Sequence, residues 1–297
     1  MGAGEDDPLN LFIFGIGFSG VEIAKAALAQ GASVAGTTRS GAKAARLASL
    51  GIEALLFDGA APNGILSKRL ETVSHLLVSI GPDAAGDPVL SAFGSGLAAN
   101  MPALEWIGYL STVGVYGDHD GAWVDEETPC RPVSKRSIER LKAEAAWRAL
   151  AKDISIPLAI LRLSGIYGPG RNTFVNLDDG SARRIIKPGQ YFNRIHVSDI
   201  SGAAMLLAAR KADGLFNVTD NEPAPPQDVV TYAAKLMGIK PPPETAYEDA
   251  QMSPMARSFY GEVKRVSNAK IRALGYEFVF PNYRAALADM WQNGRWR

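Results

Sequence analysis

The sequence predicts an α/β fold with a doubly wound parallel sheet and a smaller α/β lobe toward the C-terminus. Short apolar runs that end in Gly, Asp or Ser alternate with Ala- and Leu-rich stretches of helical pattern, which is typical of βαβ units. A glycine-rich turn follows the first apolar run directly. The length of 297 residues, with 47% hydrophobic residues, allows a large core without a metal or a disulfide.

The strand and helix patterns follow one another along the first part of the chain. The expected strands are residues 9–14, 32–37, 52–57, 75–80, 107–110 and 158–163. The expected helices are residues 21–30, 43–49, 136–152, 198–209, 227–237 and 283–292. After about residue 169 the chain becomes rich in Asp-Gly and Pro-containing turns. We therefore expect a first domain over residues 1–170, with returning segments near 190–220, and a smaller, interleaved lobe over 171–297.

Charge and composition exclude several classes of protein. Lys plus Arg total 31 and Asp plus Glu total 31, which argues against a nucleic-acid groove or an anionic membrane as partner. No apolar run is long enough to span a bilayer, and residues 1–8 lack the pattern of a secretory signal. Cys130 is the single cysteine, and no group of His, Cys, Asp and Glu has metal-ligand spacing. These features predict a cytoplasmic enzyme or small-molecule binder that holds no metal.

The glycine-rich turn matches the dinucleotide-binding pattern G-x-G-x-x-G. Gly15 permits a tight turn, Gly17 lets the backbone approach a pyrophosphate, and Gly20 allows close packing of helix on strand. Phe18 and Ser19 lie in the same turn and are also expected at the cofactor, because the free N–H groups at the N-terminus of the following helix favour a phosphate. The alternative is a glycine turn without a ligand, but its place between a strand and a helix favours a Rossmann cofactor site.

The end of the second strand distinguishes between the two nicotinamide cofactors. An NAD site usually has Asp or Glu there, whereas this chain has Thr38, Arg39 and Ser40. Arg39 and Ser40 suit a 2′-phosphate, so NADP is the expected cofactor, and NAD is the alternative if Arg39 is only a solvated loop residue. Asp58 is expected near the adenine. Ser79 and Gly81 are expected to line the cofactor from the fourth strand.

Four later stretches resemble segments of one superfamily. They are LSTVGVYG at 110–117, LRLSGIYGPG at 161–170, RIHVSDI at 194–200 and SNAKIRALGY at 267–276. Together with the glycine turn they resemble the extended short-chain dehydrogenase/reductase superfamily, in its NAD(P)-dependent epimerase/dehydratase group. The resemblance runs in order over most of the chain. It implies a Rossmann domain, a nicotinamide cofactor and a substrate-binding lobe.

The resemblance also implies a Tyr-x-x-x-Lys pair with a Ser or Thr, and here the chain departs from it. Thr112 aligns with the hydroxyl residue, and Ser111 is its neighbour. The Tyr and Lys positions fall on Arg136 and Arg140, and no tyrosine lies between Tyr116 and Tyr167. Arginine stays protonated and is no general base at ordinary pH. The chain therefore resembles the atypical subgroup, which lacks these catalytic residues.

Several side chains remain as candidates for the reaction and for substrate binding. Tyr116 is a stand-in proton donor, although a packing role under the substrate is the alternative. Arg136, Arg140 and Tyr167 are candidates for binding a sugar-derived or anionic substrate, since guanidinium groups form strong hydrogen bonds with carboxylate and phosphate. Ordinary surface arginines are the alternative, and His119, His196 and Cys130 are expected to have structural or no special roles.

Two functions of different classes remain open at this point. The first is an NAD(P)-binding epimerase/dehydratase-like oxidoreductase with a non-standard active site. The second is a non-catalytic NADP-binding sensor or regulatory protein, which the missing tyrosine suggests. The resemblance also implies a homodimer, formed through the helix at residues 136–152.

Overall fold

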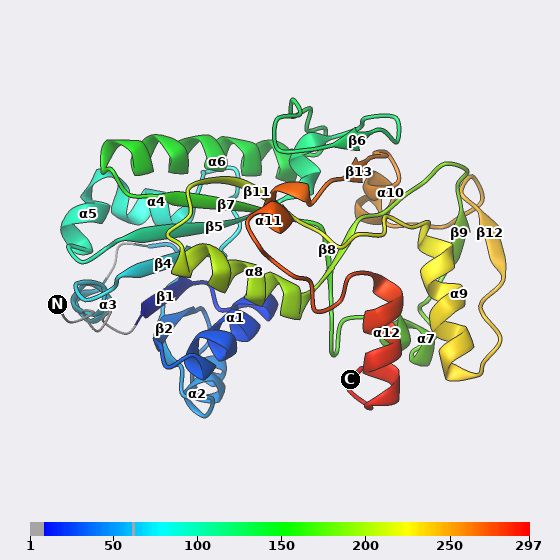
Figure 1. The fold of residues 1–297 in the computed structure, drawn as a ribbon, viewed down its shortest axis with the longest axis horizontal. Coiled ribbons are helices and arrows are strands. Elements are labelled where there is room, and N and C mark those ends of the chain that lie inside the picture. The colour runs from blue at the N-terminus through cyan, green and yellow to red at the C-terminus, as the bar shows by residue number, and fades with distance from the viewer. Residues whose placement is uncertain (1–8, 61–62) are drawn as a thin grey trace. The chain divides into compact units, whose positions relative to one another are not determined.

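The computed structural model describes residues 9–60 and 63–297 (Figure 1). The prediction of no secretory signal concerns residues 1–8, which lie outside the described residues. A seven-stranded sheet has the order β11-β7-β5-β4-β1-β2-β3, and the pairs from β3 to β5 are parallel. Its strands are β1 (Asn10–Phe14), β2 (Ser33–Thr38), β3 (Glu53–Leu56), β4 (His75–Val78), β5 (Trp106–Thr112), β7 (Leu158–Leu163) and β11 (Gly214–Val218). This order confirms the predicted Rossmann sheet.

Helices connect these strands on both faces of the sheet. Figure 1 shows α4, α5 and α6 on one face and α1 and α8 on the other. The helices of this part are α1 (Phe18–Ala29), α2 (Gly41–Ala48), α3 (Gly64–Leu70), α4 (Pro88–Phe93), α5 (Leu97–Asn100), α6 (Lys135–Asp153) and α8 (Val197–Ala209), with short 3₁₀ turns at Gly94–Gly96 and Val113–Tyr116. Strand, helix and strand follow one another because parallel neighbours need a crossover connection.

The chain divides into two compact units. The first comprises Met1–Ser111, Glu139–Leu161 and Ser201–Leu215, and the second comprises Thr112–Ile138, Arg162–Ile200 and Phe216–Arg297. The interleaving of segments gives each unit residues from both halves of the sequence. The predicted domain boundary at residue 170 remains a prediction.

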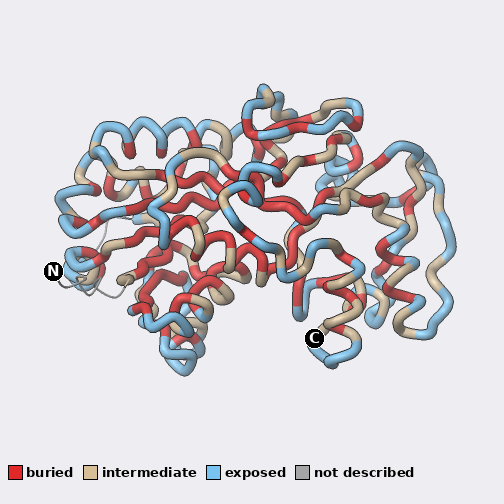
Figure 2. The backbone as a smooth tube through the Cα atoms, viewed as in Figure 1, coloured by how far each residue is buried: buried red, intermediate tan, exposed pale blue. Residues whose placement is uncertain are grey.

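The first unit has a core between the sheet and the helices of one face. Phe12, Phe14 and Trp147 are fully buried there, together with apolar residues from α3, α4 and α5. Strands β1, β4, β5 and β7 are buried along most of their length (Figure 2). Their near-continuous apolar runs are what a parallel sheet covered on both faces requires.

The second unit consists of short strand pairs and helices. The pairs are β8 (Gly165–Tyr167) with β10 (Arg194–His196), β9 (Arg184–Ile186) with β12 (Glu244–Ala246), and β6 (Trp123–Val124) with β13 (Arg265–Val266). The helices are α7 (Thr173–Asp178), α9 (Pro226–Met237), α10 (Pro254–Phe259), α11 (Ala269–Ala273) and α12 (Tyr283–Gln292). Phe174, Tyr283 and Leu287 form a small core among α7, α9 and α12. No described helix is long and apolar enough to cross a membrane.

Candidate functional site

The glycine turn lies between β1 and α1, as predicted, but the helix begins at Phe18 rather than at residue 21. Gly15 has a φ of 86°, and a Cβ there would lie 2.6 Å from Ile80 Cγ1, so the turn requires glycine. A Cβ on Gly20 would lie 3.2 Å from the carbonyl oxygen of Gly15, which shows how closely the helix approaches the strand. No side chain caps α1 at Gly17, so its N-terminus stays open toward a ligand.

A cavity of about 380 Å³ lies in the first unit, at the carboxyl ends of β1, β2, β3 and β4. Six residues that the sequence predicted for the cofactor line it: Gly15, Gly17, Thr38, Arg39, Asp58 and Gly81. The other predicted cofactor residues are not part of this lining, namely Phe18, Ser19, Gly20, Ser40 and Ser79. The Ser40 side chain instead caps α2, where it accepts a hydrogen bond from the Lys43 N–H at 3.3 Å. Whether each of these residues contacts a cofactor remains a prediction.

Lys43 is a lining residue that the sequence reasoning missed. It lies in the first turn of α2, so its side chain joins that of Arg39 at the same cavity. Burial lowers the pKa of the Lys43 ammonium, and the nearby Arg46 lowers it further. Two cations at one cavity wall favour an anionic group. The spacing R-x-x-x-K from the strand end into the helix is the signal that would have identified it.

Arg140 lies beside the cavity within the first unit. Its Nη1 donates to the Leu110 carbonyl oxygen at 2.8 Å and to the Tyr109 hydroxyl at 3.2 Å. Its Nη2 would lie 3.3 Å from a Cβ on Gly81, which is itself a lining residue. The guanidinium is therefore fixed by β5 and faces the end of β4.

Ser111 and Thr112 differ in how their hydroxyls are used. The buried Ser111 hydroxyl donates to Glu144 Oε1 at 2.5 Å, which ties β5 to α6. The half-buried Thr112 accepts the N–H of Gly114 at 3.1 Å. Its own hydroxyl proton is not used in that contact, so it can donate to another oxygen.

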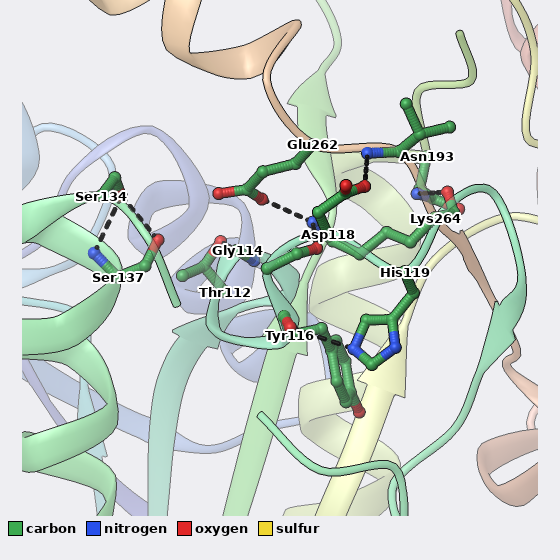
Figure 3. A network of polar contacts seen from close by, with 12 residues as sticks. Thr112, Gly114, Tyr116, Asp118, His119, Ser134, Ser137, Asn193, Glu262 and Lys264 are labelled. Carbon is green, nitrogen blue, oxygen red and sulfur yellow. Dashed lines mark hydrogen bonds and ion pairs between the residues drawn. The ribbon is translucent and has the colours of Figure 1, made fainter. Parts of the chain in front are cut away.

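The loop after β5 is held in place by a polar network in the second unit (Figure 3). The buried ammonium of Lys264 donates to the Gly117 carbonyl oxygen at 2.7 Å and to Glu262 Oε2 at 2.6 Å. Asp118 Oδ1 accepts the N–H of Val263 at 2.7 Å. His119 Nε2 lies 3.1 Å from the Tyr116 carbonyl oxygen. The imidazole of His119 thus stabilises the loop.

Two serines at the start of α6 lie against the same loop (Figure 3). Ser134 Oγ donates to Ser137 Oγ at 2.9 Å and accepts the Ser137 N–H at 3.2 Å. A Cβ on Gly114 would lie 2.8 Å from Ser137 Oγ and 3.4 Å from Thr112 Oγ1. The hydroxyls of Thr112 and Ser137 therefore both approach Gly114, where only glycine leaves room.

Tyr116 is in a setting that does not favour proton donation. Its ring is fully buried and lies under the guanidinium of Arg162, 4.8 Å from the ring centroid. Its hydroxyl donates to Asn217 Oδ1 at 2.7 Å. Burial raises the pKa of the Tyr116 hydroxyl to about 12. These contacts support the packing alternative.

The remaining candidates are spread over the second unit. Arg136 is exposed and stacks on Phe259, 5.6 Å from the ring centroid. The Tyr167 hydroxyl is buried and has no hydrogen-bond partner among the described residues. The His196 ring packs edge-on against Phe280 at 4.5 Å, and its Nδ1 accepts the Ser198 N–H at 3.2 Å.

Helix α8 begins at Val197, so Ser198 and Asp199 lie within its first turn rather than at its N-cap. The Asp199 carboxylate instead accepts from the Tyr276 hydroxyl and the N–H groups of Val279 and Phe280. Asp199 thereby anchors the segment that leads to α12.

A Rossmann sheet with a glycine turn and a lined cavity at the end of its first strands defines a dinucleotide-binding class of protein. The sequence model of the NAD dependent epimerase/dehydratase family matches residues 11–218. The chain therefore belongs to this family, as the resemblance in its motifs implied.

Three known proteins show how this chain is related to others. A solved structure, described as a functionally unknown conserved protein from Silicibacter pomeroyi DSS, is 44% identical, with a TM-score of 0.87 over 96% of this chain and 99% of that one. Protein YeeZ of Escherichia coli K12 is 29% identical over 91% of this chain and 96% of its own length. A 3-diazoavenalumate denitrifying reductase from a Streptomyces species is 28% identical over 56% of this chain and 55% of its own length.

Proposed function

We propose that this protein is an NADPH-dependent oxidoreductase of the epimerase/dehydratase type, acting on a small sugar-derived or anionic substrate with a non-standard active site. The observation that carries the proposal is the cavity at the glycine turn, which has Arg39 and Lys43 on its wall. The similarity to a denitrifying reductase supports reduction as the reaction class.

The residues of the cavity fit a phosphorylated dinucleotide. The uncapped N-terminus of α1 suits a pyrophosphate, and Gly17 has no side chain to obstruct it. Arg39 and Lys43 suit a 2′-phosphate, which is the group that distinguishes NADP from NAD. When bound, the nicotinamide supplies or accepts a hydride.

The chain's own side chains then have distinct tasks. The Thr112 hydroxyl donates a hydrogen bond to the substrate oxygen and so orients the reacting carbon. Arg140 is fixed by Leu110 and Tyr109 beside Gly81, and we assign it to holding an oxygen-rich part of a bound ligand. Arg136 and Tyr167 remain candidates for the substrate, and Tyr116 has a structural role.

Calorimetry and fluorescence separate the two candidate functions. Titration with NADPH and NADH tests cofactor binding, and binding of neither would exclude both functions. Loss of NADPH fluorescence over a panel of sugars, aldehydes and diazo compounds tests turnover. Tight binding of NADPH without turnover of any compound would instead favour the sensor, the function that the absent Tyr-x-x-x-Lys pair suggests.

The preference for NADP is expected to depend on the two cations. Arg39→Asp removes one cation and introduces an acid that suits the ribose hydroxyls of NAD, so the ratio of NADPH to NADH affinity should fall by about 10²-fold or more. Lys43→Ala should lower it by about tenfold. Lys68→Asp, an exposed residue on α3, makes the same change of charge away from the cavity and should leave the ratio unchanged. An unchanged ratio in Arg39→Asp would refute this assignment.

A further inference from the structure

The carboxyl group of Asp220 lies inside the second unit, 1% exposed. One oxygen, Oδ1, accepts the N–H of Glu222 at 3.1 Å. The other, Oδ2, is buried and has no hydrogen-bond partner among the described residues. A buried carboxylate oxygen without a partner is costly when it is charged, so its surroundings suit the protonated form.

Arg194 is the cation near this carboxyl group, but it is engaged elsewhere. Its Nη1 donates to the carbonyl oxygens of Phe192 at 2.9 Å and Ala224 at 3.1 Å. Phe192 and Ala224 are also paired with each other by two backbone hydrogen bonds, of 3.0 and 3.1 Å. Arg194 therefore clamps this short antiparallel bridge. The Asp220 N–H donates to the Arg194 carbonyl oxygen at 2.8 Å, while its Oδ2 has no hydrogen-bond partner among the described residues.

Two tyrosines around Arg194 are also incompletely satisfied. The hydroxyls of Tyr167 and Tyr283 are buried without a partner among the described residues. The Arg194 guanidinium lies 5.9 Å from the Tyr283 ring centroid. The charged and titratable groups that act on Asp220 and Arg194 from neighbouring elements are Glu222, Asp199, Tyr167, Tyr260 and Tyr283.

We propose that Asp220 is a proton-controlled switch in the second unit. With the carboxyl group neutral, Arg194 stays on the carbonyl oxygens of Phe192 and Ala224 and the bridge is closed. With the carboxylate ionised, Arg194 turns toward Oδ2 and releases the bridge. The moving part is one guanidinium, and both of its positions lie within a single cluster of side chains.

The acid–base properties of the cluster place this change near neutrality. Burial raises the pKa of Asp220 from 3.8 to about 7. The charge of Arg194 acts in the opposite direction and lowers the pKa of Asp220, but the effect of burial is larger. Because the folded pKa is raised, the folded state binds the proton more tightly than the unfolded chain. Stability is therefore expected to fall as pH rises from about 4 to about 7 and to change little above that range.

The Glu222 amide reports the charge on Asp220 directly, since it donates to Oδ1. In ¹⁵N-labelled full-length protein, its resonance is expected to shift with a midpoint near neutral pH. Asp220→Asn should abolish that shift. A Glu222 resonance that moves only in the range of an ordinary Asp, about pH 4, would overturn the proposal.

Hydrogen exchange at the bridge tests the motion itself. At about pH 9 the amides of Phe192 and Ala224 should exchange several-fold faster in the native protein than in Asp220→Asn, and at about pH 5 the two proteins should agree. Asp153→Asn removes the same charge from an exposed position and should match the native protein at both values. If the ratio of exchange rates between native and Asp220→Asn protein is the same at both pH values, the bridge is not released. This outcome does not depend on whether the protein binds NADPH.

Discussion

Individual side chains decide what chemistry this site can perform, and Tyr116 is the clearest case. It follows Thr112 by four residues in the sequence, which makes it a candidate to replace the missing catalytic tyrosine. The structure gives its hydroxyl to Asn217 and covers its ring with Arg162. Sequence alone does not show this, because Asn217 is distant in the chain.

Tyr116→Phe is expected to lower stability and to preserve turnover. Removing the hydroxyl leaves the buried Asn217 Oδ1 without its donor, at a cost of about 1–2 kcal/mol in the free energy of unfolding. Turnover of NADPH with an accepted substrate should stay within about threefold, whereas Thr112→Ala should lower kcat/KM by about 10²-fold. Denaturant unfolding and steady-state kinetics measure both effects. A folded Tyr116→Phe protein without turnover would make Tyr116 the proton donor after all.

At the scale of single elements, the sequence predicts long elements well and short ones poorly. The six predicted strands all exist within a few residues of their expected bounds, because each is a predominantly apolar run that leads into a turn. The pairs β6–β13, β8–β10 and β9–β12 were missed, since strands of two or three residues have no periodicity to detect. The short helices α3, α4 and α5 were missed for the same reason.

Asp87, which the sequence analysis did not identify, fixes the start of α4 beside the cofactor cavity. Asp87 is buried, and its Oδ1 accepts the N–H groups of Val89 and Leu90 at 2.9 and 3.1 Å. Its Oδ2 accepts the indole N–H of Trp147 on α6 at 3.1 Å. The next residue, Pro88, lines the cavity. Asp87 thus ties two helices together where the cofactor is proposed to bind.

Asp87→Ala is expected to lower the free energy of unfolding by about 2–3 kcal/mol. It removes the helix cap, worth about 1 kcal/mol, and leaves the buried Trp147 N–H without an acceptor, which costs a further 1–2 kcal/mol or so. Asn63→Ala is the matched control, because the exposed Asn63 caps α3 by accepting the Leu66 N–H and, among the described residues, makes no side-chain hydrogen bond to a second helix. It should cost only the cap. Equal losses in the two variants, measured by urea unfolding, would mean that the Trp147 contact contributes nothing.

At the scale of the whole molecule, fold and site differ in how far sequence determines them. The glycine turn, Arg39 and Asp58 were predicted because a local motif fixes their place at strand ends. Lys43 needed the structure, since only the folded chain shows that this residue lines the cavity. Arg140 was a candidate from the sequence, but only the structure places its guanidinium beside Gly81. The Asp220 cluster could not be predicted at all. It combines β8, β10, α12 and a loop, and nothing in the local sequence of any of these marks a buried carboxyl group.

Cofactor binding is expected to protect the first unit selectively, because every residue that lines the cavity belongs to it. At NADPH concentrations about 100-fold above Kd, binding should stabilise the native protein by about 2.7 kcal/mol. Hydrogen exchange followed by mass spectrometry should show slower uptake in peptides covering residues 15–18, 37–43, 57–59 and 80–83. In Arg39→Asp the same peptides should need a higher NADPH concentration to reach equal protection, and NADH should become the better ligand. Protection that appears only in segments of the second unit, such as residues 216–237, would show that the cofactor binds elsewhere.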